Sequence, residues 1–298
     1  MSILALDIGG TAIKYGLFDS SGLAVTALYE KATPKSKSTN YIMEMVTQII
    51  KDMNKNHLIE GIAISTAGVV DSKTGTVVFA GPTIPGYTNT PIKQTIERLF
   101  RIPCEVENDV NCAALGEWWK GSGKDSHSLI CITIGTGVGG AVILDGQLWH
   151  GSAHSAGEIG YLPMPSGRML QEEASATALV ADYSLLSSVP AKQLNGKIIF
   201  ENAKSGDVKA IKAIDNMLDA LNHGLLAAAY LVSPDTIIIG GGIAAQKEYL
   251  ENKIAAKLKQ QIVSERMLPK RIACAELGNT AGMIGAVYHF LGKHPIPD

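Results

Sequence analysis

Three glycine-rich segments of the sequence have the residue types that approach a nucleotide, the first two its phosphates and the third its base or ribose. Asp7-Ile-Gly-Gly-Thr11 follows a short apolar run, and Lys14 lies three residues beyond it. Gly135-Thr-Gly-Val-Gly-Gly140 lies between two apolar runs, and Gly240-Gly-Gly242 ends the β-branched run 236–239. Because glycine has no side chain, backbone N–H groups at such turns can approach phosphate oxygens closely. Each segment taken alone also fits an ordinary tight turn, since Gly-Gly turns are common.

Two better-known nucleotide-binding loops are excluded. The Walker A pattern G-x-x-x-x-G-K-[ST] is absent from the sequence. The first glycine turn is not a Rossmann fingerprint either, because residues 13–18 after it read as a strand rather than a helix. The first two segments therefore read as turns between two strands. In the second of them, Thr136 could add a hydroxyl group.

Two carboxylates lie where they could hold or activate an alcohol. Glu107-Asn-Asp109 falls between a predicted strand and a predicted helix, so Asp109 is either a helix cap or a base that accepts a hydroxyl proton. Glu158 lies in Gly157-Glu-Ile-Gly160, beside His154, and is either a solvated carboxylate or a ligand for hydroxyl groups. One base for an alcohol and several donors for phosphoryl oxygens are the requirements of phosphoryl transfer.

The elements that must position these residues alternate along the chain. Apolar and β-branched runs predict strands at 3–6, 13–18, 23–30, 61–65, 76–79, 105–107, 128–134, 139–144, 236–239 and 271–275. Helical spacing of apolar residues predicts helices at 39–54, 90–100, 110–120, 172–183, 208–231, 245–261 and 280–291. This alternation is typical of α/β layers. The similarity of Leu6-Asp-Ile-Gly-Gly-Thr11 to Ile132-Thr-Ile-Gly-Thr-Gly137 further predicts two similar halves, each with a glycine turn.

The composition excludes several classes of protein. The 298 residues include 26 Lys plus Arg and 28 Asp plus Glu, so the net charge of −2 excludes an electrostatic nucleic-acid binder. With 46% hydrophobic and 18% charged residues, bulk disorder is excluded. No apolar run is long enough for a membrane span, and no signal peptide is evident, so we expect a cytoplasmic protein. The four cysteines lack C-x-x-C spacing, which disfavours a disulfide framework or a cysteine zinc site.

Taken together, these segments resemble the ROK family (repressors, open reading frames and sugar kinases), part of the actin-like group of ATPases. The resemblance covers essentially the whole chain and implies an α/β fold of the two-lobed actin-like, ribonuclease H-like type with an interdomain cleft. It implies a small lobe at 1–115, a large lobe at 116–279 and a C-terminal helix, 280–298, that returns to the small lobe. Five motifs occur in the family's order: Asp7-Ile-Gly-Gly-Thr11 with Lys14, Glu107-Asn-Asp-Val-Asn111, Ile134-Gly-Thr-Gly-Val-Gly-Gly-Ala141, Gly157-Glu-Ile-Gly160 and Pro234-Asp-Thr-Ile-Ile-Ile-Gly-Gly-Gly242.

The resemblance also implies a role for each motif residue. Asp109 would be the catalytic base on a sugar hydroxyl. The sugar would be held by Ser65, Gly68, Asn108, Asp109, Glu158 and Tyr161. ATP would be held by Asp7, Gly9, Gly10, Thr11, Lys14, Thr136, Gly137, Gly240, Gly241 and Gly242. Asp7 would face Mg²⁺. The implied partners are a small sugar, ATP and a second copy of the chain in a homodimer, with no nucleic acid and no membrane.

One segment departs from the family pattern. Most members carry Glu-x-Gly-His and then a cysteine cluster that binds zinc, whereas Tyr161 stands at the histidine position and residues 162–173 contain no cysteine. No zinc is therefore expected. The β-glucoside kinases of the family resemble this chain here and in the ending 279–290, which implies ATP-dependent phosphorylation of the 6-hydroxyl of a cellobiose-like β-glucoside. Glucokinase and N-acetylmannosamine kinase stay open as alternatives, as does a non-catalytic sugar sensor.

Overall fold

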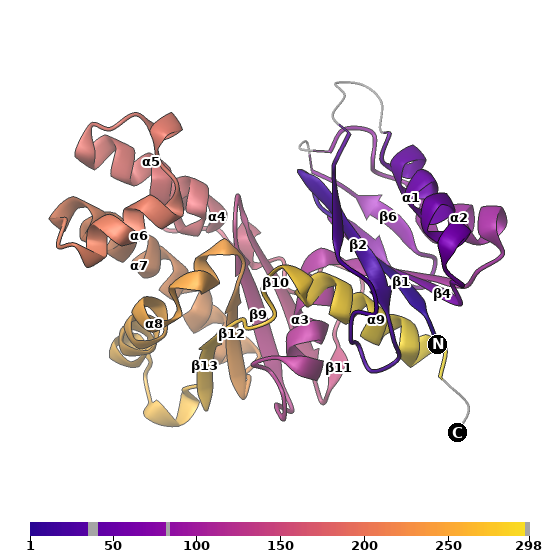
Figure 1. Cartoon of the computed structure of the whole chain (residues 1–298). Coiled ribbons are helices and arrows are strands. Elements are labelled where there is room, and N and C mark those ends of the chain that lie inside the picture. Colours follow the sequence, from indigo (N-terminus) through magenta and orange to yellow (C-terminus); the bar gives the residue numbers. More distant parts are fainter. Residues whose placement is uncertain (35–40, 82–83, 296–298) are drawn as a thin grey trace. The chain divides into compact units, whose positions relative to one another are not determined.

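The computed structural model describes residues 1–34, 41–81 and 84–295 and contains two compact units (Figure 1). The first unit comprises Met1–Lys120, His150–Ser155 and Asn279–Asp298. The second unit comprises Gly121–Trp149 and Ala156–Gly278. The lobe boundary at residue 115 stays a prediction. A lobe is a part of the chain that moves as one body, and the compact units do not show which residues move together.

The first unit is built on a five-stranded sheet of order β3-β2-β1-β4-β8. Its strands are β1 (Ile3–Ile8), β2 (Ala12–Phe18), β3 (Tyr29–Ala32), β4 (Gly61–Thr66) and β8 (Cys104–Asn108). The first three strands are antiparallel neighbours, and β1, β4 and β8 run parallel. Ile8 pairs with Thr66 and Thr66 with Asn108, so these three strands end level with one another. Residues that follow the three strands are thereby brought to one edge of the sheet.

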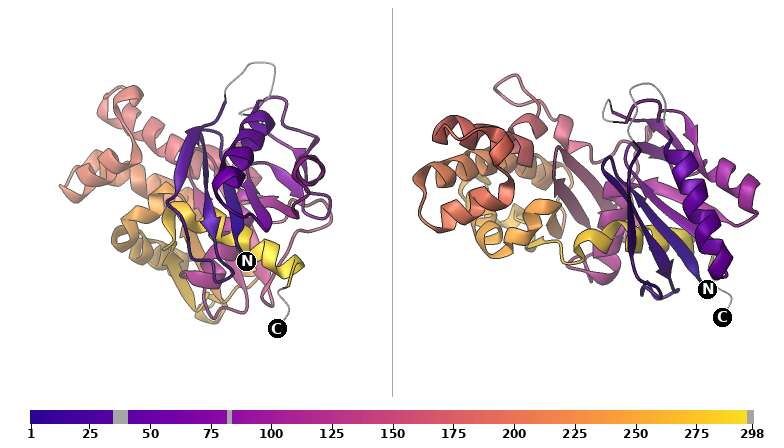
Figure 2. Two further views of the ribbon diagram at one scale, coloured as in Figure 1. Left: turned by 45° about the vertical axis from the view of Figure 1, so that its right-hand side comes forward. Right: turned by 45° about the horizontal axis from the view of Figure 1, so that its top comes forward.

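Alternation of side chains along the strands separates the two faces of this sheet. Leu4, Leu6 and Ile8 of β1 belong to a core shared with α1 (Ile42–Asn56) and α2 (Ile92–Phe100). The intervening residues face the other way because successive strand side chains alternate. The helix α9 (Ala281–Lys293) runs beside β1, β4 and β8 and packs against α3 (Asp109–Lys120) (Figures 1 and 2). A Cβ on Gly285 would overlap the carbonyl of Cys112, so glycine permits this close packing of helices. A small antiparallel sheet of β5 (Val69–Asp71), β6 (Thr76–Phe79) and β7 (Thr90–Pro91) completes the unit.

The second unit repeats the same sheet plan. Its strand order is β11-β10-β9-β12-β13, with β9 (Leu129–Ile134), β10 (Val138–Leu144), β11 (Gln147–Leu148), β12 (Thr236–Gly240) and β13 (Arg271–Cys274). Again three antiparallel strands adjoin two strands that run parallel to the first of them. This is the relation between halves that the repeated glycine motif predicts.

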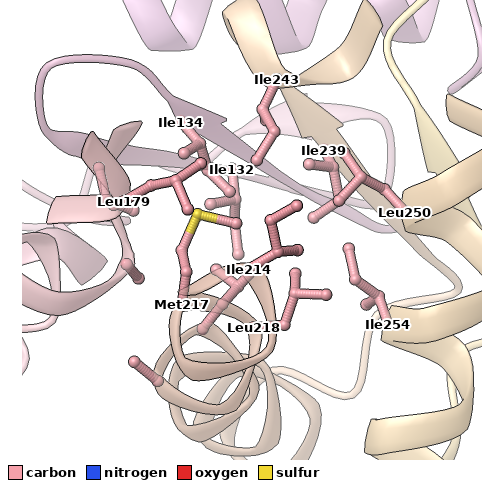
Figure 3. Packing of buried hydrophobic residues seen from close by; sticks show 14 of the residues in the cluster. Ile132, Ile134, Leu179, Ile214, Met217, Leu218, Ile239, Ile243, Leu250 and Ile254 are labelled. Atoms are coloured by element: carbon pink, nitrogen blue, oxygen red, sulfur yellow. The ribbon is translucent and has the colours of Figure 1, made fainter. Parts of the chain in front are cut away.

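The helices of the second unit pack on this sheet through an aliphatic core. Ile132, Ile134 and Ile239 of the sheet point toward Ile214, Met217 and Leu218 of α7 (Figure 3). Leu250 and Ile254 of α8 close the same cluster (Figure 3). The helices are α4 (Gln171–Ala174), α5 (Ala176–Ser187), α6 (Gly196–Lys204), α7 (Val208–Leu231) and α8 (Lys247–Gln261). No helix in the described ranges combines the length and hydropathy that crossing a membrane requires.

Several sequence predictions of local structure were wrong. The helix expected at 172–183 is two helices, because Ser175 is extended and its hydroxyl caps α5 by accepting the N–H of Ala178. The helix expected at 245–261 begins at Lys247, after a 3₁₀ turn at Gly242–Gln246. Of the strand expected at 23–30, only its end is strand, in β3. Helix α6 was not predicted, and the start of the helix expected at 39–54 lies partly outside the described residues.

Candidate active site

In the first unit, Asp7 and Ser65 lie together near the level ends of β1 and β4. The Ser65 hydroxyl donates to Oδ1 of Asp7 at 2.6 Å. Burial raises the pKa of Asp7, while the Ser65 hydrogen bond and the charge of Lys14 act in the opposite direction. A carboxylate that has lost solvation in this way is stabilised by a nearby cation. Asp7 is therefore a carboxylate whose ionised form a nearby cation would stabilise.

The glycine turn after Asp7 leaves its tip open. The Gly9 N–H donates to the carbonyl of Ala12 at 3.0 Å, which closes the turn between β1 and β2. Gly10 and Thr11 are exposed, and a Cβ on Gly10 would meet no atom within 4 Å. Lys14 pairs with Asp7 across the two strands. The turn can thus present backbone N–H groups and one ammonium group to an anion.

Asn108 caps helix α3, and Oδ1 of Asp109 also accepts the N–H of Val110 at 2.9 Å. The Asn108 side-chain oxygen accepts the N–H groups of Val110 and Asn111 at 2.9 and 3.0 Å. Its amide nitrogen donates to the carbonyl of Gly68 at 2.8 Å and to Oδ1 of Asp109 at 3.0 Å. Asp109 is the first residue of the helix and is partly exposed, so its carboxylate lies at the positive end of the helix dipole.

Gly68 requires glycine for two reasons. Its φ of +101° is unfavourable for other residues, and a Cβ would lie 2.8 Å from the carbonyl oxygen of Phe79. The turn that follows β4 therefore lies directly against β6 and offers its own carbonyl to Asn108. The predicted sugar-side residues Ser65, Gly68, Asn108 and Asp109 come from neighbouring strand ends of one unit.

A buried carboxylate lies directly beneath this strand end. Glu107 is fully buried, and its Oε1 accepts the N–H of Asn108 at 2.7 Å and the side-chain amide of Asn111 at 2.9 Å. Its Oε2 lies 2.6 Å from Nε2 of His150 and 4.0 Å from Nδ1 of His289. Burial alone would raise the pKa of Glu107, but the hydrogen bond and charge of His150, the charge of His289 and the Asn111 hydrogen bond together lower it. These contacts favour the ionised form of Glu107, and both of its oxygens have hydrogen-bond partners.

In the second unit, the glycine turn between β9 and β10 is fixed to helix α5. The Ala176 N–H donates to the carbonyl of Gly135 at 2.9 Å, and the Thr177 hydroxyl donates to the carbonyl of Thr136 at 3.0 Å. Thr136 is exposed at the tip, and a Cβ on Gly137 would lie 2.8 Å from Oε1 of Gln171. The turn thereby presents its backbone beside the N-terminus of α5, where helix N–H groups favour anions.

The glycine segment after β12 borders a cavity. Gly241 has a φ of +80°, and a Cβ there would overlap the backbone of Ile134, so the segment lies directly against the end of β9. A cavity of about 700 Å³ opens beside it, within the size range of small-molecule sites. Its lining is mostly apolar and includes Gly135, Leu179, Asn195, Phe200, Gly242 and Gln246. Of the predicted nucleotide residues, Gly242 lines this cavity, and Gly240 and Gly241 shape the turn that leads to it.

Glu158 lies on a loop whose glycines allow it to pack directly against β10. Gly157 has a φ of +90°, and a Cβ on it would lie 2.6 Å from the carbonyl oxygen of Gly140. A Cβ on Gly160 would overlap the carbonyl of Val138. Burial raises the pKa of Glu158. Tyr161, at the end of the same loop, is 50% exposed.

The segment after Tyr161 is closed by hydrogen bonds of its own. Residues 163 and 169 form a β-bridge. Ser166 donates its hydroxyl to Glu173, and the N–H of Met169 donates to Oε2 of Glu172 at 2.8 Å. Across the described residues, no cluster of three or more His, Cys, Asp or Glu side chains has a metal-binding arrangement.

Two residues of this region were missed by the sequence prediction. His150 joins Glu107 although it is far along the chain, and an isolated histidine carries no signal of such a contact. Gly282, in the first turn of α9, lies over Asp7, where a Cβ would stand 2.9 Å from Oδ1. A glycine inside a predicted helix is the signal that could have indicated this approach. The predicted residues of the first unit and those of the second form two separate groups within their own units.

Comparison with known proteins identifies a family. The ROK family model matches residues 3–293. An uncharacterized protein of Clostridium perfringens is 43% identical over 285 residues, which are 96% of each chain. A β-glucoside kinase of Listeria innocua is 34% identical over 98% of each chain. A ROK family glucokinase of Streptomyces griseus, solved with glucose and AMPPNP, superposes with a TM-score of 0.84 at 29% identity and covers 97% of this chain and 98% of its own.

Proposed function

The chain belongs to the ROK family and is a carbohydrate kinase of the actin-like ATPase fold, and we propose that it phosphorylates the 6-hydroxyl of a β-glucoside with Asp109 as the base. ATP is the phosphoryl donor in this family, and a relative was solved with the ATP analogue AMPPNP. The proposal concerns the sugar, the base, the metal ion and the residues that bind each of them.

For the nucleotide, the second unit supplies two adjacent features. The apolar cavity beside Gly242 suits adenine and ribose, with Asn195 and Gln246 as polar groups in its wall. The turn at Thr136 and Gly137 suits phosphate oxygens, because its backbone is fixed by α5 and its tip is exposed. We assign the turn at Gly9, Gly10 and Thr11 of the first unit to the phosphates as well.

Mg²⁺ fits the residues around Asp7. This ion keeps several waters and is held by one or two carboxylates together with substrate phosphates, so a single carboxylate is enough protein ligation. Asp7 is the carboxylate with the required property, because burial has weakened its solvation. When bound, Mg²⁺ would neutralise charge on the phosphate oxygens.

Asp109 is the proposed base. Its carboxylate accepts the proton of the sugar 6-hydroxyl as that oxygen bonds to the γ-phosphorus, and the bond to the ADP oxygen breaks. The transferred phosphoryl group leaves as part of the sugar phosphate, and Asp109 later releases the proton to solvent. Asn108 positions this carboxylate by donating its amide N–H to Oδ1 of Asp109, and the Val110 N–H donates to the same oxygen. We therefore assign the role of base to Oδ2.

The observation that carries the choice of a β-glucoside is Tyr161. A half-exposed aromatic ring three residues after Glu158 offers a flat apolar surface for a second ring of the substrate. The β-glucoside kinase relative supports the same choice at 34% identity over nearly its full length. Glucose, the sugar bound by the related glucokinase, and N-acetylmannosamine are the rival substrates.

The position of the new phosphate tests this proposal. Cellobiose and ATP are incubated with the protein, and the product is analysed by phosphorus–proton correlation NMR. We expect the phosphorus to couple to the 6-methylene protons of the non-reducing glucose ring. Coupling to an anomeric proton, or release of free glucose, would show a different reaction on this disaccharide.

A further inference from the structure

His150 contacts neither predicted substrate residue set, yet it is bonded to the carboxylate beneath them. We infer that His150 and Glu107 form a positioning pair that fixes the junction of β8 and α3, where Asn108 and Asp109 lie. The inference rests on the proposed role of Asp109 as base and adds a residue that determines the orientation of that base.

The hydrogen bonds of Glu107 show how the pair acts. One carboxylate oxygen holds the backbone N–H of Asn108 at 2.7 Å and the side chain of Asn111 at 2.9 Å. Asn111 lies in the first turn of α3, so both sides of the junction are tied to the same oxygen. The other oxygen is 2.6 Å from Nε2 of His150. The orientation of the junction therefore depends on how this carboxylate is held.

His150 is the hydrogen-bond partner that stabilises the buried carboxylate of Glu107. Glu107 is fully buried, and a buried charge requires a compensating donor. An ionised carboxylate only accepts hydrogen bonds, so in the form that its contacts favour Glu107 accepts from Nε2 of His150 at 2.6 Å. His289 is farther away at 4.0 Å, and burial lowers its pKa, so it is a weaker partner. Without His150, the carboxylate would retain the two asparagine donors and would shift toward solvent or take up a proton.

The segment that carries His150 is itself anchored to the first unit. Nε2 of His150 also lies 3.3 Å from the hydroxyl of Ser72. His154, in the same segment, lies 3.6 Å from Asp71 at the end of β5. The strand β5 begins directly after Gly68, which accepts the Asn108 amide. The segment thus contacts Glu107 beneath the junction and also the end of β5, the strand that follows Gly68.

Two substitutions of the same residue test the inference. His150→Gln places an amide N–H near the position of Nε2, whereas His150→Asn has the same amide on a shorter side chain that ends near the position of Nδ1. We expect His150→Gln to retain kcat within about threefold and His150→Asn to lose about tenfold or more, because small misplacements of a catalytic group are costly. The KM for ATP should stay within about twofold in both, since the hydrogen-bond partners of His150, Glu107 and Ser72, are not among the residues assigned to ATP. His57→Asn, at an exposed position, is the matched control.

The outcomes separate positioning from general stability. Melting curves show whether each variant is folded at the assay temperature, and kcat is compared between folded variants. A purely structural role would affect both substitutions alike, so equal losses would overturn the inference, as would full activity of His150→Asn. If His150→Asn is not folded at the assay temperature, Glu107→Gln takes its place, with the same expected loss of kcat and the same rejection at full activity. Asp109→Asn is assayed in parallel: near full rate in that variant would refute the proposed function itself.

Discussion

At the scale of single residues, the account depends most on Asp109. Its carboxylate is partly exposed at the start of α3 and is oriented by Asn108, and these are the properties of a base that must meet an alcohol. The sequence alone left open whether Asp109 was a cap or a base. In the structure Asn108 accepts two N–H groups of the first turn, and Asp109 Oδ1 accepts one of the same two, from Val110 at 2.9 Å. The other carboxylate oxygen of Asp109, Oδ2, is the one we propose as the base.

Replacement of Asp109 by Asn should therefore separate chemistry from binding. We expect kcat to fall by about 10²–10⁴-fold, the usual contribution of a general base, while the dissociation constant for the sugar changes by less than about fivefold. Steady-state kinetics and calorimetric titration of the sugar measure the two quantities. Asp125→Asn, at an exposed position in the second unit, is the control. A variant with more than half of the original kcat would rule out Asp109 as the base.

Glu158 predicts a dependence of stability on pH. Burial raises its pKa in the folded protein, so the folded state favours the protonated form. The stability that this group contributes is present below its unfolded pKa and is lost as the pH rises through the folded value. We therefore expect Glu158→Gln to melt at a higher temperature than the original protein at pH 7 and at about the same temperature at pH 4. Equal melting temperatures at pH 7 would contradict this.

At the scale of elements, glycines determine how closely the site loops approach the strands. Gly157 and Gly167 both have a positive φ, at +90° and +82°, but only Gly157 lies against another backbone. A side chain at Gly157 would displace the loop that carries Glu158, whereas one at Gly167 would extend into open space. Comparing Ala substitutions at Gly157 and Gly167 therefore distinguishes the effect of backbone strain from the effect of moving the Glu158 loop.

We expect Gly157→Ala and Gly167→Ala each to lower the free energy of unfolding, by about 1–3 kcal/mol from strain. Only Gly157→Ala should also lower kcat/KM for the sugar, by about tenfold or more. Denaturant unfolding and steady-state kinetics measure the two effects. Similar kcat/KM values in the two variants would show that the Glu158 loop does not need its close contact with β10.

The sequence predicted most of the strands because apolar and β-branched runs mark buried strands directly. It did not separate α4 from α5, since the break depends on the extended backbone of Ser175 and its capping hydroxyl. Helix α6 was not predicted either, because its buried apolar residues, Ile199, Phe200 and Ala203, form too short a pattern to indicate a helix. The candidate site residues were predicted from the sequence motifs. The His150–Glu107 contact was not predicted, because it arises from tertiary packing alone.

At the scale of the whole molecule, the two units repeat one sheet plan with a glycine turn at the same place. The turn joins the first two antiparallel strands of each sheet, β1 to β2 and β9 to β10. In the first unit the adjoining parallel strands lead to the predicted sugar residues, and in the second unit they lead to Gly240, Gly241 and Gly242. One plan used twice thus places a glycine turn and predicted site residues at the strand ends of each unit.

The central claim is that this kinase prefers a β-glucoside. ADP release, coupled to NADH oxidation, is measured with cellobiose, glucose and N-acetylmannosamine under the same conditions with ATP and Mg²⁺. The account predicts a kcat/KM at least about tenfold higher for cellobiose, the scale of a difference of 1.4 kcal/mol in transition-state binding. A kcat/KM higher for glucose or for N-acetylmannosamine than for cellobiose would contradict it.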